Sequence, residues 1–193
     1  RTINIIEPDS LIVHEVLKND VSCKDYSDAE VEIVATGGNT KTYKIKNTAN
    51  AQTNSLFSNL GPGNYFVTVT DQNNCLAFYR APRSFALTEP DSLFVDSKIV
   101  TPVSCYGFNN GSVVVNASGG TIPYQFDLGL SGSNSVQRGN VFDNLSPGSY
   151  LISMTDANDC PMYSRGPLNF DVTEPDQIIV QSVLVNPISC FGF

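Results

Sequence analysis

Five cysteines are the residues of this 193-residue chain whose types and spacing best suit a specific chemistry. Cys23, Cys105 and Cys190 each follow a Val-Ser or Ile-Ser pair, whereas Cys75 and Cys160 each end a Thr-Asp-x-Asn-x-Cys motif. The chain has a single histidine and no Cys-x-x-Cys pair, so the recurring spacing favours a disulfide framework over a metal site. A disulfide framework in turn indicates an extracellular protein.

Two pairings of these cysteines are compatible with the spacing. Pairing within each repeat joins Cys23 to Cys75 and Cys105 to Cys160, whereas pairing across repeats joins Cys75 to Cys105 and Cys160 to Cys190. Chain entropy credits either choice with roughly 3 to 4 kcal/mol, so energy does not decide between them. We expect the within-repeat pairing, because a small module needs a cross-link inside its own core. It requires a broken or shifted first strand, since in a plain immunoglobulin topology the two turns lie at opposite ends.

Catalytic chemistry finds little support. The one histidine, His14, falls on an expected strand, and no Gly-x-Ser-x-Gly nucleophile motif is present. Asp71 and Asp156 occupy equivalent positions in different repeats, so we interpret them as turn-stabilising residues and not as paired acids. We therefore expect no enzyme activity.

Structural calcium is the alternative to a chain without cofactors. Glu89-Pro90-Asp91 lies at an expected module boundary, and the acids between Asp156 and Asp159 could approach such a boundary. The Asp-x-Asp-x-Asp-Gly loop of a calcium site is missing, however. We expect no cofactor and interpret the acids as a stiff Pro corner with solvated carboxylates.

The overall charge excludes several partners. A formal net charge of −8 and an isoelectric point near 4.4 argue against nucleic acid and against electrostatic docking on anionic lipid. No apolar run approaches the roughly 20 residues that would span a bilayer, so we expect no membrane insertion in this segment.

The elements that position the cysteines follow from one duplicated stretch. Residues 61–75 (GPGNYFVTVTDQNNC) return as residues 146–160 (SPGSYLISMTDANDC). Each copy begins at a Pro-Gly turn, continues as a strand with alternating apolar residues, and ends in a second turn that carries the cysteine. Such a half-buried strand must be the central strand of its own small sheet.

Further anchors recur with the same period and define the modules. The motif Glu-Pro-Asp occurs at residues 7–9, 89–91 and 174–176. We therefore expect four segments. Residues 1–8 are the last strand of a preceding repeat, residues 9–90 and 91–175 are two complete repeats, and residues 176–193 are the start of a third, truncated repeat.

The fold class is expected to be all-β, with tandem immunoglobulin-like β-sandwich repeats in an extended array. About seven short strands with frequent turn signals fit each repeat, and no segment shows a capped helical pattern. Residues 128–140 (LGLSGSNSVQRGN) are an insertion in the second repeat, which we expect to be a surface loop.

The combination of motifs resembles the SprB-type repeat of cell-surface adhesins in gliding Bacteroidetes. The second repeat carries nearly the whole pattern, whereas the first lacks the two glycines after Cys23 and has Thr42-Tyr43 in place of Pro-Tyr. Both copies lack the tryptophan that is common in the family. The matching positions of the second repeat are Cys105, Gly107, Gly111, Gly119, Gly120, Pro123, Tyr124, Gly148, Tyr150, Asp156 and Cys160.

The resemblance implies a structural and adhesive segment of a secreted surface filament, exported by type IX secretion and used in gliding motility. Its partners would be neighbouring repeats of the same chain and a surface polysaccharide or substratum. The resemblance also implies a glycoprotein, because Asp9-Ser10-Leu11 and Asp91-Ser92-Leu93 match the short O-glycosylation pattern of that lineage. We therefore expect glycans on Ser10 and Ser92.

A carbohydrate-binding accessory module of a secreted multidomain protein is the alternative function. Tyr43, Tyr124, Phe126 and Phe142 would then form a sugar-binding platform. Aromatic residues in the strands of a sandwich usually lie in its core, so we expect the filament segment instead.

Overall fold

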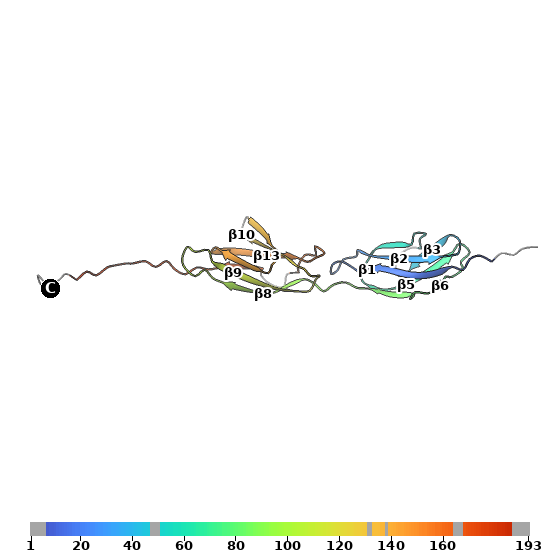
Figure 1. Cartoon of the computed structure of the whole chain (residues 1–193), viewed down its shortest axis with the longest axis horizontal. Coiled ribbons are helices and arrows are strands. Elements are labelled where there is room, and N and C mark those ends of the chain that lie inside the picture. The colour runs from blue at the N-terminus through green and yellow to red at the C-terminus, as the bar shows by residue number, and fades with distance from the viewer. Residues whose placement is uncertain (1–6, 47–50, 131–132, 138, 164–167, 187–193) are drawn as a thin grey trace, which may run out of the picture. The chain divides into compact units, whose positions relative to one another are not determined.

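The computed structural model describes residues 7–46, 51–130, 133–137, 139–163 and 168–186 (Figure 1). In this part of the chain every regular element is a β-strand, which confirms the all-β prediction. The chain forms two compact units. The first contains Arg1–Phe94, Ser118–Tyr124 and Met154–Tyr163, and the second contains Val95–Ala117, Gln125–Ser153 and Ser164–Phe193.

The first repeat folds as a sandwich of two sheets. One sheet has the order β4-β2-β1-β6 and the other the order β3-β5-β7. All described pairs are antiparallel except β1 with β6. The strands are β1 (Ile12–Asn19), β2 (Ala29–Thr36), β3 (Lys41–Ile45), β4 (Leu56–Leu60), β5 (Gly63–Asp71), β6 (Phe78–Tyr79) and β7 (Ser84–Leu87).

Alternation of apolar and polar residues explains how these strands bury one face. In β2, Ala29, Val31 and Ile33 are buried, whereas Glu30 and Glu32 between them are exposed. The same alternation buries Val67 and Val69 of β5, the strand expected to be central, which pairs with β3 on one side and β7 on the other. These inner faces form one apolar core between the two sheets.

The second repeat has its corresponding strands in the same order, with β11 added beside β10 and, among the described residues, no strand in the place of β6. Its sheets have the orders β12-β9-β8 and β11-β10-β13-β14, so β13 is again the central strand that precedes a cysteine turn. This arrangement confirms immunoglobulin-like sandwiches. The strands are β8 (Phe94–Thr101), β9 (Gly111–Ser118), β10 (Gln125–Leu130), β11 (Ser133–Gln137), β12 (Val141–Leu145), β13 (Gly148–Thr155) and β14 (Asn169–Val172).

A tyrosine fixes the turn that begins each central strand. The Tyr65 hydroxyl donates a hydrogen bond to the Gly61 carbonyl at 2.8 Å, and the Tyr150 hydroxyl donates to the Ser146 carbonyl at 2.9 Å. The Tyr65 ring stacks on Phe85 with 5.7 Å between ring centroids. Each tyrosine therefore ties the Pro-Gly turn to the strand that follows it.

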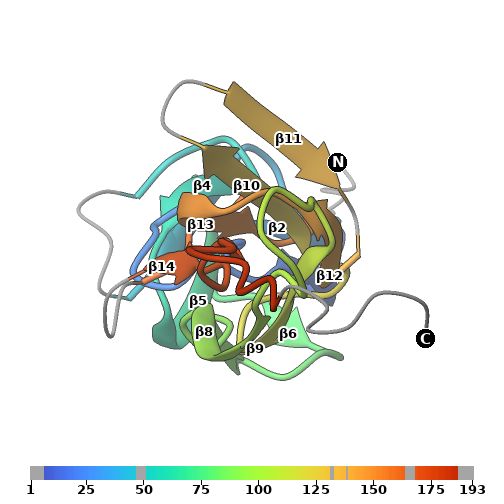
Figure 2. The same cartoon turned by 90° about the vertical axis from the view of Figure 1, so that its left-hand side faces the viewer.

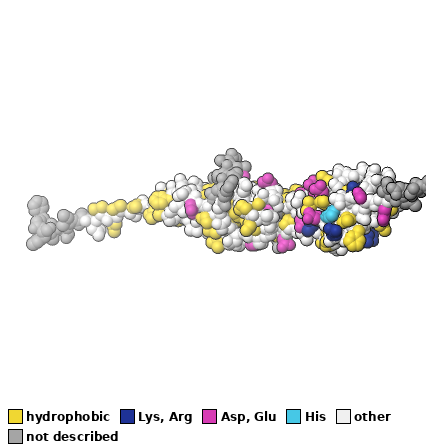
Figure 3. Space-filling view, turned by 45° about the vertical axis from the view of Figure 1, so that its right-hand side comes forward, with side chains coloured by type: hydrophobic (Ala, Val, Ile, Leu, Met, Phe, Trp, Pro, Cys, Tyr) yellow, Lys and Arg dark blue, Asp and Glu magenta, His cyan; other side chains and the backbone are white. Residues whose placement is uncertain are grey.

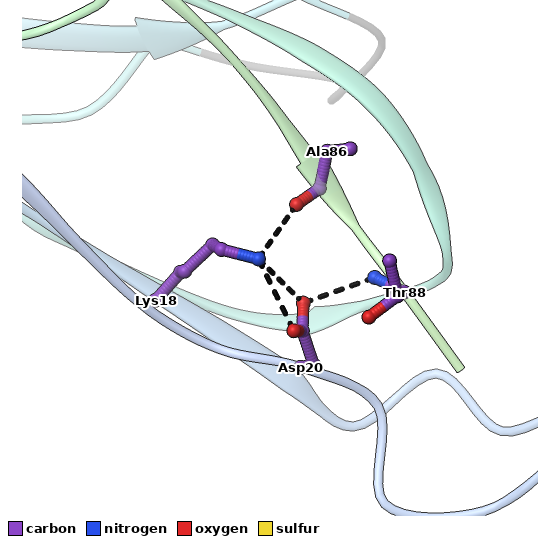
Figure 4. Close-up of polar contacts among 4 residues, drawn as sticks. All are labelled: Lys18, Asp20, Ala86 and Thr88. Carbon is purple, nitrogen blue, oxygen red and sulfur yellow. Dashed lines mark hydrogen bonds and ion pairs between the residues drawn. The ribbon is translucent and has the colours of Figure 1, made fainter. Parts of the chain in front are cut away.

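A polar clamp joins the end of β1 to β7 on the opposite sheet (Figure 4). The Lys18 ammonium donates to the Ala86 carbonyl at 2.9 Å and to the Asp20 carboxylate at 3.0 Å. Asp20 also accepts the Thr88 backbone N–H at 2.9 Å, and this bond, followed by the bond from Lys18, lowers the Asp20 pKa. The clamp therefore fixes the point at which the chain leaves β1 toward Cys23.

The segment inserted in the second repeat contains a strand, which the prediction of a surface loop did not include. Residues 128–140 were expected to be a loop, but β11 lies within them and pairs antiparallel with β10 from Phe126–Gln137 to Leu130–Ser133 (Figure 2). The backbone hydrogen bonds of this hairpin outweigh the turn-favouring composition of the segment.

The predicted end segments are described only in part. Residues 1–6 and 187–193 lie outside the described residues, so the expected module boundaries stay predictions. Residues 176–186 form no strand, and hydrophobic side chains line this segment (Figure 3). Ile178 is 95% exposed and Leu184 is 87% exposed.

Candidate functional site: a disulfide-linked loop cluster

A disulfide in the first unit joins Cys23 to Cys160, two residues that are 137 positions apart in the sequence. Their Cα atoms are 5.5 Å apart, within the usual range for a cystine. Both residues are buried, at 3% and 5% exposure. The bond connects the first repeat to the cysteine turn of the second. We call this cystine and its two loops, residues 21–28 and 156–163, the cystine cluster.

The cystine corrects both predicted pairings. The Cys75 turn lies near the beginning of β1, because Asp71 and Leu11 both approach Gly38 and the Phe78 N–H donates to the Leu11 carbonyl at 2.8 Å. Cys23, in contrast, follows the other end of β1. The eight residues of β1 extend roughly 26 Å at about 3.3 Å per residue, far beyond the ~7 Å limit of a disulfide. The expected Cys23–Cys75 bond would therefore need a broken β1, and β1 is continuous.

The remaining predicted disulfide residues have no disulfide partner among the described residues. Cys75 and Cys105 are free thiols, and both are exposed. The expected Cys105–Cys160 bond is thus also wrong, because Cys160 is bonded to Cys23. Cys190, which belonged to the alternative pairing with Cys160, lies outside the described residues.

A buried carboxylate shapes the Cys160 turn. Asp156 is fully buried, and its Oδ1 accepts the N–H groups of Asn158 at 2.9 Å and Cys160 at 3.0 Å. Its Oδ2 accepts the Thr121 N–H at 2.8 Å. Asp159 takes a left-handed conformation with φ of 59°, which Asp tolerates better than most residues. Asp156 therefore has the turn-stabilising role that we interpreted from the sequence.

A second carboxylate, from the Glu-Pro-Asp anchor, shapes the Cys23 loop. Glu89 accepts the Asp25 backbone N–H at 2.8 Å and forms an ion pair with Lys24. The hydrogen bond from Lys24 and then that from Asp25 lower the pKa of Glu89. Ser22 donates its backbone N–H to Asp28 at 3.0 Å, which closes the loop on its other side. Glu89 thus connects the end of one repeat to the loop that carries its cysteine.

Two further hydrogen bonds accompany the cystine. The Asn158 side-chain amide donates to the Ser22 carbonyl at 3.1 Å, and the Tyr163 hydroxyl donates to the Asp25 carboxylate at 3.1 Å. The bond to Asp25 raises the pKa of Tyr163. The sequence analysis missed Asn158 and Tyr163. Asn recurs three residues after the threonine of each Thr-Asp-x-Asn-x-Cys motif, but this recurrence does not reveal which loop the Asn side chain contacts.

The residues considered for other chemistry lie elsewhere. His14 forms a hydrogen bond with the Thr36 hydroxyl through Nε2 at 2.7 Å, which links β1 to β2. Tyr43, Phe126 and Phe142 are buried in the sandwiches, and the Tyr124 hydroxyl donates to the Gly119 carbonyl at 2.6 Å. Tyr43, Phe126 and Phe142 therefore form core contacts and not the sugar platform considered above, whereas Tyr124 is only partly buried.

The expected glycosylation serines and the side chains that could bind a metal ion can be located in the structure. Ser10 is exposed and Ser92 is partly buried, so the two expected glycosylation positions differ in accessibility. Within the described ranges, no three His, Cys, Asp or Glu residues gather in an arrangement suited to a metal ion. The part of the chain that the structure describes also contains no helix long and apolar enough to span a bilayer.

Comparison with known proteins identifies the repeat type. The SprB repeat model matches residues 97–129, which lie in the second repeat. No curated protein matches the chain in sequence. Among solved structures, the chain is similar to the C-terminal 282-residue fragment of intimin, solved in complex with the intimin-binding domain of the translocated intimin receptor. The identity is 12% and the TM-score 0.39, over 85% of this chain and 64% of that fragment.

A second similar structure is that of the FN1–FN3 domains of chicken CNTN1. Its identity to this chain is 10% and its TM-score 0.37, over 86% of this chain and 69% of the other. The chain thus spans somewhat less than two thirds of the intimin fragment and somewhat more than two thirds of the CNTN1 fragment.

Proposed function

We propose that this chain, which carries a SprB-type repeat at residues 97–129, is a load-bearing tandem-repeat segment of a secreted filament on the cell surface. SprB repeats belong to cell-surface proteins, and a buried cystine suits an oxidising, extracellular compartment. The repeat type and the sandwich fold are typical of structural and adhesive domains without enzyme activity.

The observation that carries this proposal is the span of the Cys23–Cys160 bond. A chain pulled from its two ends can lengthen only through residues outside a closed covalent loop. The cystine closes a loop of 137 residue steps, which includes the core strands β2 to β7 of the first repeat and β8 to β13 of the second. Unfolding of these strands under load would therefore not lengthen the chain while the bond is intact.

The finer role follows from the family. We propose that the filament adheres to a substratum or surface polysaccharide during gliding, that it leaves the cell through type IX secretion, and that neighbouring repeats of the same chain are its immediate partners. The resemblance of the motifs supports this role, and the buried positions of Tyr43, Phe126 and Phe142 favour it over the carbohydrate-binding module.

Antibodies raised against the 193-residue chain test the proposal on intact cells of the source organism. We expect immunogold label on filaments outside the outer membrane, and loss of that label after brief protease treatment of intact cells. Cells that lack residues 91–175 of the protein should retain the filament but adhere less to glass. Label confined to the cell interior, or to a compact secreted enzyme complex, would overturn the proposal.

A further inference from the structure

Two exposed cysteines of the described chain are the repeat equivalents of the two bonded ones. Cys75 occupies in the first repeat the position that Cys160 occupies in the second, and Cys105 occupies in the second repeat the position of Cys23 in the first. Cys23 and Cys160 are bonded to each other, whereas Cys75 and Cys105 are free thiols. The bonded pair therefore joins the Val-Ser-Cys cysteine of one repeat to the Thr-Asp-x-Asn-x-Cys cysteine of the next repeat.

The turn that carries Cys75 has the geometry of the bonded turn. Oδ1 of Asp71 accepts the N–H groups of Asn73 at 2.8 Å and Cys75 at 2.9 Å, as Oδ1 of Asp156 does in the Cys160 turn. Asn74 takes the left-handed conformation with φ of 62°, close to that of its equivalent in the bonded turn. The Cys75 thiol is thus held by the same backbone arrangement as a cysteine that forms a disulfide.

The loop that carries Cys105 also reproduces its bonded counterpart. The Gly107 N–H donates to Glu174 at 2.7 Å, as the Asp25 N–H donates to Glu89. The Phe108 N–H donates to the Cys105 carbonyl at 3.1 Å, and the equivalent bond to the Cys23 carbonyl measures 3.2 Å. The loop has therefore formed without its disulfide, and it presents the Cys105 thiol to solvent.

Each free cysteine has exposed apolar residues within three positions of it in the sequence. Leu76 and Phe78 are 65% and 69% exposed, and Tyr106 and Phe108 are 53% and 55% exposed. Phe78 is the equivalent of Tyr163, whose hydroxyl bonds to the loop of the preceding repeat in the cystine cluster. The repeat equivalents of Leu76, Phe78, Tyr106 and Phe108 are Pro161, Tyr163, Lys24 and Tyr26, which line the same pocket as Cys23 and Cys160.

We infer that the Cys23–Cys160 bond is one member of a series, in which the Val-Ser-Cys cysteine of every repeat is bonded to the Thr-Asp-x-Asn-x-Cys cysteine of the repeat that follows it. Cys105 then takes the corresponding cysteine of a following repeat, and Cys75 takes the Val-Ser-Cys cysteine of a preceding repeat. Each bond forms between two thiol sulfurs, which lose two protons and two electrons. A disulfide oxidant accepts the electrons by exchange and is reduced to two thiols.

This inference deepens the proposed function, because it names the neighbouring repeat as a covalent partner. It rests on that proposal only in requiring that the repeats belong to a longer array. Its test uses purified protein and measures disulfide connectivity, so it can fail while surface location and adhesion stand, and the reverse also holds.

The test extends the full chain by one repeat, through insertion of a second copy of residues 9–90 between Pro175 and Asp176. Cys75→Ser in the original copy and Cys23→Ser in the inserted copy make every cysteine-containing peptide unique. The protein is refolded in glutathione redox buffer, and the monomer is digested without reduction and mapped by mass spectrometry. We expect a Cys23–Cys160 linkage and a linkage from Cys105 to the Cys75 of the inserted copy, with Cys190 as a thiol.

A matched variant with Cys105→Ser should leave the inserted Cys75 as one additional thiol that iodoacetamide alkylates in the folded protein. The inference is overturned if Cys105 is linked to Cys160 or to Cys190. It is equally overturned if Cys105 and the inserted Cys75 both stay thiols while Cys23–Cys160 forms. The absence of the Cys23–Cys160 bond would also overturn the inference, because the series is inferred from that bond.

Discussion

Asp156→Ala removes the carboxylate that organises the Cys160 turn, and the structure allows its cost to be estimated. Asp156 accepts three backbone N–H groups, at 2.8, 2.9 and 3.0 Å, and its side chain is fully buried. Asn158 is exposed, so water can replace the bond to its N–H, but the N–H of buried Cys160 would lose its partner. A lost charged hydrogen bond costs roughly 1.5 to 3 kcal/mol, and we expect a total loss of about 2 to 4 kcal/mol.

Denaturant unfolding of the oxidised chain measures this loss, with Asp143→Ala as the matched control. Asp143 is an exposed carboxylate on β12, so its removal should change the free energy of unfolding by less than about 0.5 kcal/mol. The Asp156 variant should also form the Cys23–Cys160 bond more slowly, because the turn no longer holds Cys160 in place. Equal unfolding free energies for the two variants would refute the role assigned to Asp156.

Three further predictions concern charge, metal and modification. The hydrogen bonds from Lys24 and the Asp25 N–H lower the pKa of Glu89 in the folded state, so its contribution to stability is present above the unfolded pKa and is lost as pH falls through the folded pKa. Glu89→Gln should therefore reduce the loss of unfolding free energy at acidic pH, and an unchanged loss would contradict this. EDTA should leave the melting temperature unchanged, because backbone N–H groups and Lys24 already occupy the carboxylates of Asp156 and Glu89. A lower melting temperature that calcium restores would instead support the calcium alternative. Native material should carry glycans on Ser10 and Ser92, and peptide mapping that finds both serines unmodified would exclude them.

Much of the fold could be predicted from residue patterns, because strand alternation and turn chemistry are local. The duplicated stretch predicted β5 and β13 as central strands, and the structure confirms both. Asp71 and Asp156 were interpreted as turn residues because an Asp side chain readily bonds to backbone N–H groups two to four residues ahead. These assignments depend only on neighbours in the sequence.

The cystine could not be predicted in the same way, because its two halves belong to different repeats. The recurring spacing of the cysteines fits several pairings, and the correct one depends on which end of β1 each loop adjoins. Cys23 and Cys75 lie at opposite ends of a plain sandwich, but the need of a small module for a cross-link in its own core favoured pairing them. The cross-repeat alternative joined Cys75 to Cys105 and Cys160 to Cys190, and it did not include the bond from Cys23 to Cys160. The hairpin of β10 and β11 was missed for a different reason, since Gly and Ser in residues 128–140 suggested a loop.

Force spectroscopy of the chain, held at its two ends, measures most directly whether the cystine makes this segment load-bearing. Cys75, Cys105 and Cys190 are replaced by serine, so that the Cys23–Cys160 bond is the one disulfide the chain can form. That bond holds two Cα atoms 5.5 Å apart across 137 residue steps, which would span roughly 480 Å when extended at ~3.5 Å per residue. The contour length of the fully unfolded chain should therefore grow by about 470 Å when reductant is added, and the oxidised Cys160→Ser variant should already show the longer value. Equal contour lengths with and without reductant would contradict the proposal that this bond limits extension.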